Sequence, residues 1–161
     1  MVKIRKAKMS DLAQIDEIYV NSSIDEVRTQ FPKKPLTSIK AELDKYKSER
    51  LRGFKKGINS GSEILLVALD KKEIIGFGEA IISKDDNSKA EATKIYINKA
   101  FRGKGAGSML MKYLLGWLKG KKVSSVSAGI FAKNFASIGL AKKFGFEITA
   151  VRMQKKLKTS K

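Results

Sequence analysis

The sequence predicts a single α/β domain with a mixed central sheet of about six to seven strands, flanked by about four helices. Strand-like and helix-like segments alternate along the chain. The early strand-like segments follow one another through short turns, whereas helix-like segments separate the later ones, which must cross over. A length of 161 residues suits one domain with a sizeable core. We therefore expect residues 1–157 to form this domain and residues 158–161 to be a basic tail.

The chain is predicted to begin with a strand and a helix. Residues 2–7 alternate apolar and cationic side chains, which is typical of a strand with one buried face. Ser10 and Asp11 can cap the helix that follows. Its expected apolar stripe consists of Leu12, Ile15, Ile18 and Tyr19.

A second helix is predicted after an irregular stretch. Residues 22–36 are expected to be irregular because Pro32 and Pro35 break helices. Thr37 can cap a helix that continues to about Ile58. Its apolar positions are Ile39, Leu43, Tyr46, Leu51 and Phe54.

Three predicted strands then follow in hairpin order. Residues 63–69 and 73–83 are rich in apolar and β-branched side chains, and residues 70–72 form the turn between them. Residues 85–87 make the next turn, and residues 90–97 the third strand.

The last third of the sequence alternates helix and strand. A helix is predicted over residues 106–119, a strand over 123–130, a helix over 135–144 and the closing strand or strands over 146–157. The first of these helices should bury the stripe Leu110, Tyr113, Leu114, Trp117 and Leu118.

Composition excludes several kinds of chemistry. The chain has no Cys and no His, which rules out a disulfide, a thiolate nucleophile, an imidazole base and a Cys- or His-based metal site. We expect no bound metal. No leader-like segment and no run long enough to cross a bilayer are visible in the sequence, so we expect a soluble, cytoplasmic protein without a membrane partner.

The chain is strongly basic. It has 34 Lys and Arg against 16 Asp and Glu, a formal net charge of +18. Such a charge attracts anions, among them nucleotides, coenzyme A, nucleic acids and acidic proteins. The lysines are spread along the whole chain, which equally fits a charged, solvated surface.

The glycine-rich segment at residues 102–107 is the most specific feature of the sequence. Its three glycines alternate with Lys104 and Ala106, and Arg102 precedes them. A glycine-rich turn that opens a helix leaves backbone N–H groups free to bind a phosphate or pyrophosphate. The spacing fits neither a P-loop nor a dinucleotide fingerprint, since Ser108 or Leu110 stands where the latter needs its last glycine.

Two blocks of the sequence resemble the GNAT N-acetyltransferase superfamily. Residues 95–107 match the family's strand followed by Arg/Gln-x-x-Gly-x-Gly/Ala, with Arg102, Gly105 and Gly107 at the signature positions. Residues 134–146 are similar to its Asn-x-x-Ala-x-x-Leu…Lys-x-Gly-Phe helix and turn, although Ala136 and Ser137 are shifted or substituted relative to this pattern.

The resemblance implies an acetyl-CoA site and no metal. The pyrophosphate would lie on the glycine-rich turn and the pantetheine arm beside the strand that ends at Ile97, whose N–H would polarise the thioester carbonyl. Asn134 would hold the pantetheine arm, although it suits a helix N-cap equally well. The implied cofactor-binding residues are Ile95, Tyr96, Ile97, Arg102, Gly103, Lys104, Gly105, Ala106, Gly107, Ser108 and Asn134.

Attack on a thioester needs a neutral amine, and an alkylamine has a pKa near ~10, so a base or water chain must remove a proton. Glu91 stands eleven residues before Arg102, the offset of a catalytic glutamate in the family, and is our first candidate. Glu79, in an otherwise apolar strand, is the second. Either could instead pair with a lysine on a neighbouring strand. Tyr19 and Tyr96 are candidates to line the acceptor site, or core residues.

One position departs from the family pattern. Many members carry a Tyr that protonates the leaving thiolate where this chain has Ala141.

From the resemblance as a whole we predict an acetyl-CoA-dependent N-acetyltransferase acting on a primary amine, such as a protein N-terminus or a small amine. The alternatives are a basic module that binds RNA or an acidic partner and transfer of another acyl group. A homodimer is also left open.

Overall fold

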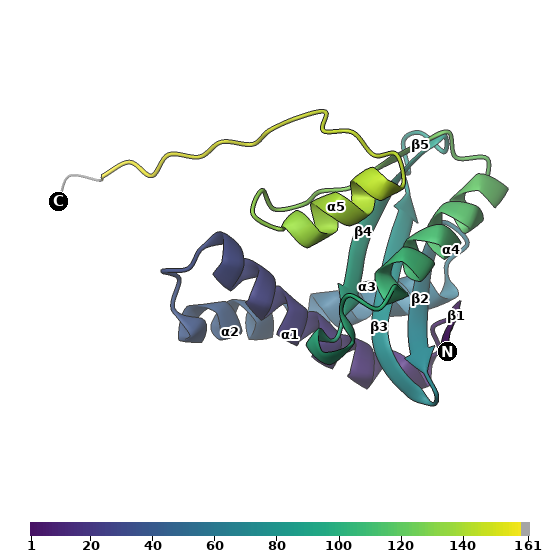
Figure 1. Cartoon of the computed structure of the whole chain (residues 1–161), viewed down its shortest axis with the longest axis horizontal. Coiled ribbons are helices and arrows are strands. Elements are labelled where there is room, and N and C mark those ends of the chain that lie inside the picture. The colour runs from purple at the N-terminus through teal and green to yellow at the C-terminus, as the bar shows by residue number, and fades with distance from the viewer. Residues whose placement is uncertain (159–161) are drawn as a thin grey trace.

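The computed structural model describes residues 1–158 and confirms the α/β architecture (Figure 1). In these residues one sheet has the order β1-β2-β3-β4-β5, antiparallel except for the parallel pair β4 and β5. The elements are β1 (Val2–Lys6), α1 (Leu12–Gln30), α2 (Leu36–Lys45), α3 (Lys47–Asn59), β2 (Glu63–Asp70), β3 (Glu73–Ile82), β4 (Lys89–Ile97), α4 (Ala106–Gly120), β5 (Ser125–Ser127) and α5 (Phe135–Lys143). Short 3-10 turns at Met9–Asp11 and Lys99–Phe101 lead toward α1 and α4.

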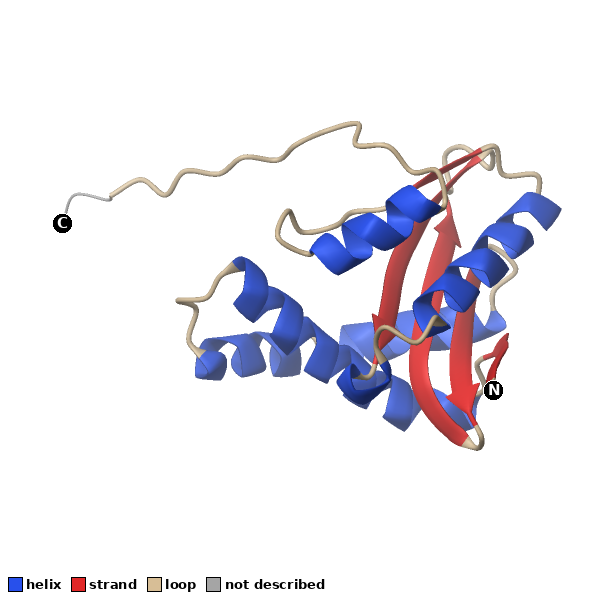
Figure 2. Ribbon diagram, in the orientation of Figure 1, coloured by secondary structure: helices blue, strands red, loops and turns tan. Residues whose placement is uncertain are grey.

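Helices cover both faces of the sheet, and each face has its own apolar core (Figure 2). On one face, Leu110, Leu114 and Leu118 of α4 are fully buried against the sheet. On the other, Ile15 of α1 and Phe54 of α3 pack with the strand residues. The predicted stripe of α4 is therefore largely correct, but Tyr113 is 51% exposed and does not belong to it.

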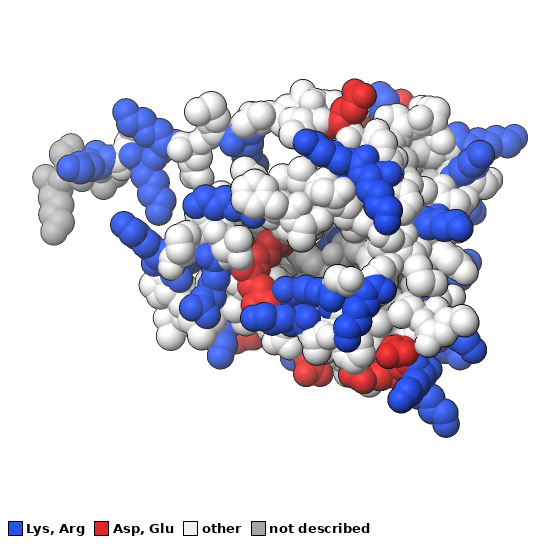
Figure 3. All heavy atoms as spheres, viewed as in Figure 1, with Lys and Arg blue, Asp and Glu red and all other residues white. Residues whose placement is uncertain are grey.

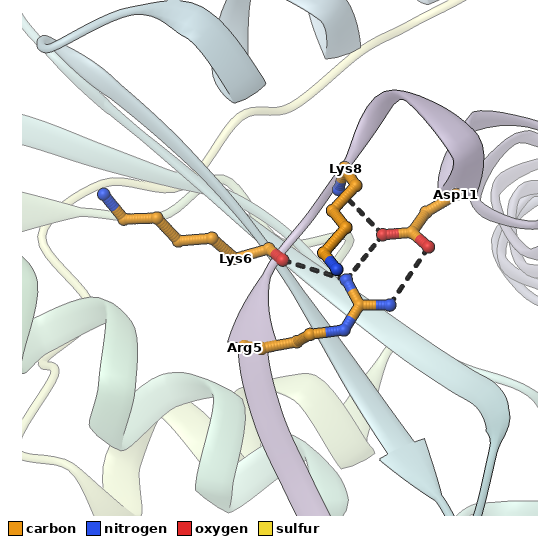
Figure 4. A network of polar contacts seen from close by, with 4 residues as sticks. All are labelled: Arg5, Lys6, Lys8 and Asp11. Carbon is orange, nitrogen blue, oxygen red and sulfur yellow. Dashed lines mark hydrogen bonds and ion pairs between the residues drawn. The ribbon is translucent and has the colours of Figure 1, made fainter.

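An ion pair fixes the start of α1 to the first strand (Figure 4). Arg5 on β1 donates from Nη1 to Asp11 Oδ2 at 2.6 Å and from Nη2 to Oδ1 at 3.1 Å. The same carboxylate accepts the backbone N–H of Lys8 at 2.7 Å. The hydrogen bond from Arg5 holds the pKa of Asp11 below its ordinary value. Asp11 stands at the predicted N-cap position of α1, but its side chain makes no capping hydrogen bond to this helix; its carboxylate instead closes the preceding 3-10 turn and joins it to the sheet.

The helical half of the chain differs from prediction in two places. Residues 22–36 were predicted to be irregular, yet α1 continues to Gln30, because both prolines lie beyond its last turn. The helix predicted from Thr37 to Ile58 is two helices that meet at Tyr46. At this break Arg50 Nη1 donates to the carbonyl of Leu43 at 2.8 Å and so satisfies an acceptor that a continuous helix would have used.

The C-terminal part also corrects the prediction. The strand predicted at residues 123–130 is reduced to β5, which pairs with residues 89–91 of β4 alone. Residues 146–157 were predicted to form the closing strand or strands, but they form none and extend away from the sheet (Figure 1). Ile148, Val151, Met153 and Leu157 are 66–91% exposed. The sheet has five strands rather than six or seven because an alternating pattern alone does not supply a strand with a partner. Of the predicted basic tail, residues 159–161 lie outside the described residues.

Beyond Glu91 the two last strands separate. The register between β3 and β4 shifts at Glu79/Ala80, where Lys94 pairs with Glu79 and Ala92 with Ala80, so that Thr93 is the extra residue of a bulge. No strand pairs with the outer edge of β4 from Ala92 onward in the described part of the chain. The fold thus leaves one strand edge open beside the N-terminus of α4.

Candidate active site

Residues 102–108, here called the glycine turn, connect the 3-10 turn after β4 to α4. Gly103 and Gly105 have φ values of 75° and 87°, a left-handed conformation that glycine adopts without strain. From Gly103 to Ser108, none of the six consecutive backbone N–H groups has an acceptor among the described residues. With the positive end of the α4 dipole behind them, these groups form an anion site of the kind that binds phosphates.

Two lysines lie at the rim of the glycine turn. Lys104 Nζ donates to the carbonyl of Ala100 at 3.4 Å and lies over the ring of Phe101. Lys143, at the end of α5, donates to Ser108 Oγ at 3.4 Å. Both lysines are exposed, so both ammonium groups are free to reach an anion bound on the turn.

Arg102 points away from the open N–H groups. Its Nε donates to the carbonyl of Ile97 at 2.9 Å, and its Nη1 lies 3.1 Å from Asp25 Oδ2 on α1. In this conformation Arg102 fixes the start of the glycine turn to β4 and α1.

The open edge of β4 presents backbone groups toward the gap between β4 and β5. The N–H of Asn98 donates to the carbonyl of Ile75 at 2.8 Å, and Ile97 is paired with Gly76. In an antiparallel ladder this geometry turns the N–H and C=O of Ile97 away from β3. By alternation the same holds for Ile95. An extended amide-containing ligand can therefore pair with this edge as an added strand would.

Three side chains meet beside this edge, and we call Glu26, Tyr96 and Asn134 the three-segment junction. Glu26 Oε2 of α1 accepts the hydroxyl hydrogen of Tyr96 on β4 at 2.9 Å. Glu26 Oε1 accepts from Asn134 Nδ2 at 2.9 Å. Asn134 Oδ1 also accepts the N–H of Ser137 at 3.1 Å, so Asn134 is the N-cap of α5. One carboxylate thus joins α1, β4 and α5.

The two tyrosines expected near the acceptor both lie on the α1 side of the sheet. Tyr96 contacts Tyr19 and Phe77 edge-on, each at 5.7 Å between ring centroids. Burial, together with the negative charge of Glu26, raises the pKa of Tyr96 well above its ordinary value, so its hydroxyl remains a donor. Tyr19 packs on Phe54 and carries the guanidinium of Arg50 over its ring at 4.8 Å, which makes it part of the core as well.

The two predicted catalytic carboxylates occupy different environments. Glu79 is 3% exposed, and its carboxylate accepts hydrogen bonds from Lys94 and Thr93 on β4. The alternative reading of Glu79, a cross-strand partner for a lysine, therefore describes its geometry. Glu91 is exposed, lies next to Gly129 at the point where β4 and β5 separate, and has no cationic partner within the described residues.

This face of the molecule is hollowed and carries charges of both signs. Figure 3 shows Lys and Arg atoms on two sides of a central hollow and Asp and Glu atoms beside it, over α1. A cavity of about 410 Å³ lies between α1 and the ends of β3 and β4. Its charged lining residues are Glu17, Asp25, Glu73, Lys99 and Arg102. Acidic residues thus outnumber basic ones in the lining, three to two, whereas basic residues outnumber acidic ones in the chain as a whole.

Sequence reasoning missed Glu26, Asp25 and Lys143. The first two were assigned to an irregular stretch, and their partners lie up to 108 residues away. A signal was present, because the positions i+3, i+4 and i+7 from Tyr19 are Ser22, Ser23 and Glu26, so the inner face of the helix becomes polar there.

A protein-family model described as the acetyltransferase (GNAT) family matches residues 23–146, more than half of the chain. The chain belongs to the GNAT family. The match contains the glycine turn, the open edge of β4 and all three members of the junction. It confirms the family indicated by the two sequence blocks.

Solved structures with this GNAT fold cover nearly the whole chain. PaiA N-acetyltransferase from Thermoplasma acidophilum, in complex with coenzyme A, has a TM-score of 0.78 and 19% identity over 94% of this chain and 93% of its own. An N-acetyltransferase from Staphylococcus aureus has a TM-score of 0.67 and 26% identity over 93% and 86%. AAC(6')-Iy, bound to the bisubstrate analogue CoA-S-monomethyl-acetylneamine, has a TM-score of 0.67 and 17% identity over 99% of each chain. No curated protein sequence matches the chain.

Three further findings bear on the GNAT site. Ala141 is buried in α5, so this position offers no hydroxyl. Within residues 1–158 no three Asp or Glu side chains are grouped closely enough to hold a metal ion. Over the same residues, no helix has the length and apolar character needed to cross a bilayer.

Proposed function

We propose that the chain is an acetyl-CoA-dependent N-acetyltransferase that transfers the acetyl group directly to a primary amine in a ternary complex. The observation that carries the proposal is the row of free N–H groups from Gly103 to Ser108, next to the open edge of β4. The two features match two adjoining parts of coenzyme A, the pyrophosphate and the extended amide-bearing arm.

In this proposal the glycine turn holds the pyrophosphate through its backbone, and Lys104 and Ser108 add a charge and a hydroxyl. The N–H and C=O groups of Ile95 pair with the pantetheine amides, and Asn134 approaches the same arm from across the gap. One outward N–H of β4, that of Ile97, donates to the thioester oxygen, where negative charge develops during transfer.

Acetyl-CoA supplies the acetyl group as a thioester, whose C–S bond breaks as the amine nitrogen bonds to the carbonyl carbon. The protein's task is to orient the amine and accept its proton. Glu91 is the proposed base, because its carboxylate is free of cations in the described residues and accessible to water. Glu79 is the second candidate, and its ion pair with Lys94 makes it the less available one. Since Ala141 offers no acid, the thiolate leaves without one, which its pKa near ~8.5 permits.

The proposed acceptor is a protein N-terminus or a small amine. A polycation such as spermidine would be repelled at long range by a net charge of +18. A screen of acceptors at fixed acetyl-CoA tests this part, and spermidine giving the highest kcat/KM would contradict it.

Calorimetric titration of acetyl-CoA at near-physiological salt tests the central proposal. Gly105→Glu places a side chain at a φ of 87° and a carboxylate among the free N–H groups. Gly116→Glu adds the same side chain to an exposed position of α4 with open space around it, and serves as the matched control. We expect one-to-one binding by the wild type and Gly116→Glu, and at least a 100-fold loss in Gly105→Glu. Equal binding by all three proteins would contradict the site.

The net charge favours a second function, a module that binds RNA or an acidic partner on the same scaffold. Such binding weakens steeply with salt and needs no glycine turn. RNA binding that survives Gly105→Glu, in a protein that does not bind acetyl-CoA, would put this function first.

A further inference from the structure

Glu26 differs from every other carboxylate of the chain. Eight of the 16 acidic side chains form ion pairs within 4.0 Å. Of the remaining eight, none has a cationic partner among residues 1–158, and seven are exposed to solvent. Glu26 is the one that is half-buried without such a partner. A charge that is partly removed from water without a counter-charge costs folding free energy. The position of Glu26 therefore needs an explanation.

The partners of Glu26 are neutral and orient its carboxylate. The Tyr96 hydroxyl and the Asn134 amide each donate to one oxygen, at 2.9 Å in both cases. The raised pKa of Tyr96 keeps that hydroxyl protonated at every pH where the protein would work. A carboxylate can accept about four hydrogen bonds. The junction therefore fixes the group in place and leaves acceptor capacity for a ligand.

The carboxylate lies beside the part of β4 where transfer is proposed to occur. Tyr96 stands between Ile95 and Ile97, whose outward N–H groups line the open edge. Asn134 reaches Glu26 from the other side of the gap, at the start of α5. Glu79, by contrast, is occupied by Lys94, and Glu91 lies four residues from the nearest of these N–H groups, at the far end of the open edge.

We propose that Glu26 binds the ammonium group of the acceptor, so that the substrate class is a positively charged primary amine entering along α1. The ammonium donates to the free lone pairs of Glu26 and supplies the missing counter-charge, which lowers the cost of the half-buried carboxylate. Glu26 is then a substrate-positioning residue, and a chain of water molecules carries the proton from the ammonium to the base. This inference rests on the proposed function and adds the recognition of the acceptor to it.

The test compares Glu26→Gln with Glu49→Gln. Glutamine at position 26 keeps the junction's hydrogen bonds, because a tyrosine hydroxyl both accepts and donates, and removes only the charge. Glu49 is on α3, exposed and without a cationic partner in residues 1–158, so its replacement changes the net charge equally at a position outside the site. Release of the coenzyme A thiol is measured with n-butylamine, spermidine and the amide of the peptide Ala-Gly-Ser, and KM and kcat are compared on the best of the three.

We expect Glu26→Gln to raise the KM for the amine about 10- to 100-fold, the worth of one charge-assisted hydrogen bond, with kcat changed less than threefold. Glu49→Gln should stay within twofold of the wild type. The Kd for acetyl-CoA, measured by calorimetry, should be the same in all three proteins. That readout separates the two proposals, because it reports the coenzyme site whatever happens to the amine.

Three results overturn the role of Glu26. One is an unchanged KM for the amine in Glu26→Gln. Another is a fall in melting temperature with a parallel weakening of acetyl-CoA binding, which marks a purely structural clamp. The third is a wild type that binds acetyl-CoA and acetylates none of the three amines, which refutes the proposed acceptor class as well. A wild type that does not bind acetyl-CoA refutes the proposed function itself.

Discussion

The glycine turn and the three-segment junction both lie beside the open edge of β4, and they are built from different chemical groups, backbone N–H groups in the turn and side chains in the junction. The turn is seven consecutive residues, six of which have backbone N–H groups without an acceptor among the described residues. The junction consists of three side chains from α1, β4 and α5 that are up to 108 residues apart. The first therefore depends on local conformation, and the second depends on how the helices are placed on the sheet.

The difference also extends to charge. The turn is exposed, and the positive helix end and the lysines at its rim favour an anion. The junction is half-buried and carries one uncompensated negative charge. In our proposals the turn therefore binds the phosphates of the donor, and the junction binds the ammonium group of the acceptor. A basic protein can thus still hold a half-buried carboxylate that has no cationic partner among the described residues, and this is the feature on which the proposed cation site rests.

The largest expected effect is a loss of unfolding free energy in a variant of Glu79. This residue is the strongest alternative to Glu26 as the carboxylate that binds the amine. Glu79→Gln leaves Lys94 without its charge partner, and breaking a buried pair costs about 3–5 kcal/mol. We expect the lower end of this range because the Lys94 side chain keeps 24% of its exposure. Urea unfolding measures the loss, and acetylation under native conditions should retain its KM for the amine.

Glu91→Gln is the matched control for that variant. It removes an exposed carboxylate on the next strand, so its unfolding free energy should stay within about 0.5 kcal/mol of the wild type. Its kcat should fall about 100-fold or more if Glu91 is the base. A stable Glu79→Gln protein with a similar loss of kcat would exchange the two roles.

A variant of the ion pair at the start of α1 tests whether binding of the amine depends on the position of this helix or only on the charge of Glu26. Asp11→Asn should cost about 1–3 kcal/mol at pH 7, because it leaves the Arg5 guanidinium with a weaker partner. The pKa of Asp11 is lowered in the folded protein, so its contribution is present above an unfolded pKa near ~4 and is lost as the pH falls through the folded value.

Unfolding of Asp11→Asn at pH 7 and pH 3 measures this difference, and the gap to the wild type should narrow at the lower pH. Exposed Asp44, without a cationic partner among the described residues, provides the control Asp44→Asn. The KM for the amine should not change in either variant at pH 7. A rise in this KM with Asp11→Asn would show that the position of α1, rather than the charge of Glu26, sets acceptor binding.

Much of the fold was predictable because its signals are local. Periodicity placed β2, β3, β4 and α4, and the glycine spacing located the turn within a few residues. The closing strand predicted at residues 146–157 is wrong because alternation describes one segment, whereas a strand needs a second one to pair with.

The break at Tyr46 was invisible for a related reason. No glycine or proline marks it, and it depends on Arg50 reaching back to Leu43. The same division between local signals and long-range contacts applies to the candidate site. Residues of the turn could be named from sequence, but Glu26 becomes informative only once α1 is placed beside β4 and α5.

Ionic strength should separate the turn from the junction. The turn is exposed and binds through full and partial positive charges, so the Kd for acetyl-CoA should rise roughly three- to tenfold between 50 and 300 mM salt. The ammonium contact is half-buried and less screened, so the KM for a monoamine should change less than twofold. Calorimetry and steady-state kinetics over the same salt series measure both. The reverse ranking would place the acceptor's charge recognition at the exposed surface instead.

The smallest effect is expected at Tyr96. Tyr96→Phe removes one hydrogen bond to Glu26 and should cost about 1 kcal/mol between pH 7 and pH 9. Burial raises the pKa of Tyr96 in the folded protein, whereas the unfolded chain ionises near pH ~10. The wild type therefore loses this stabilisation as the pH rises above ~10. Tyr96→Phe has no ionisable group at this position, so its stability has no such dependence on pH. Urea unfolding of both proteins at pH 7, 9 and 10.5 should show a gap that is constant at first and then closes. A gap that persists at pH 10.5 would mean that the pKa of Tyr96 is not raised in the folded protein.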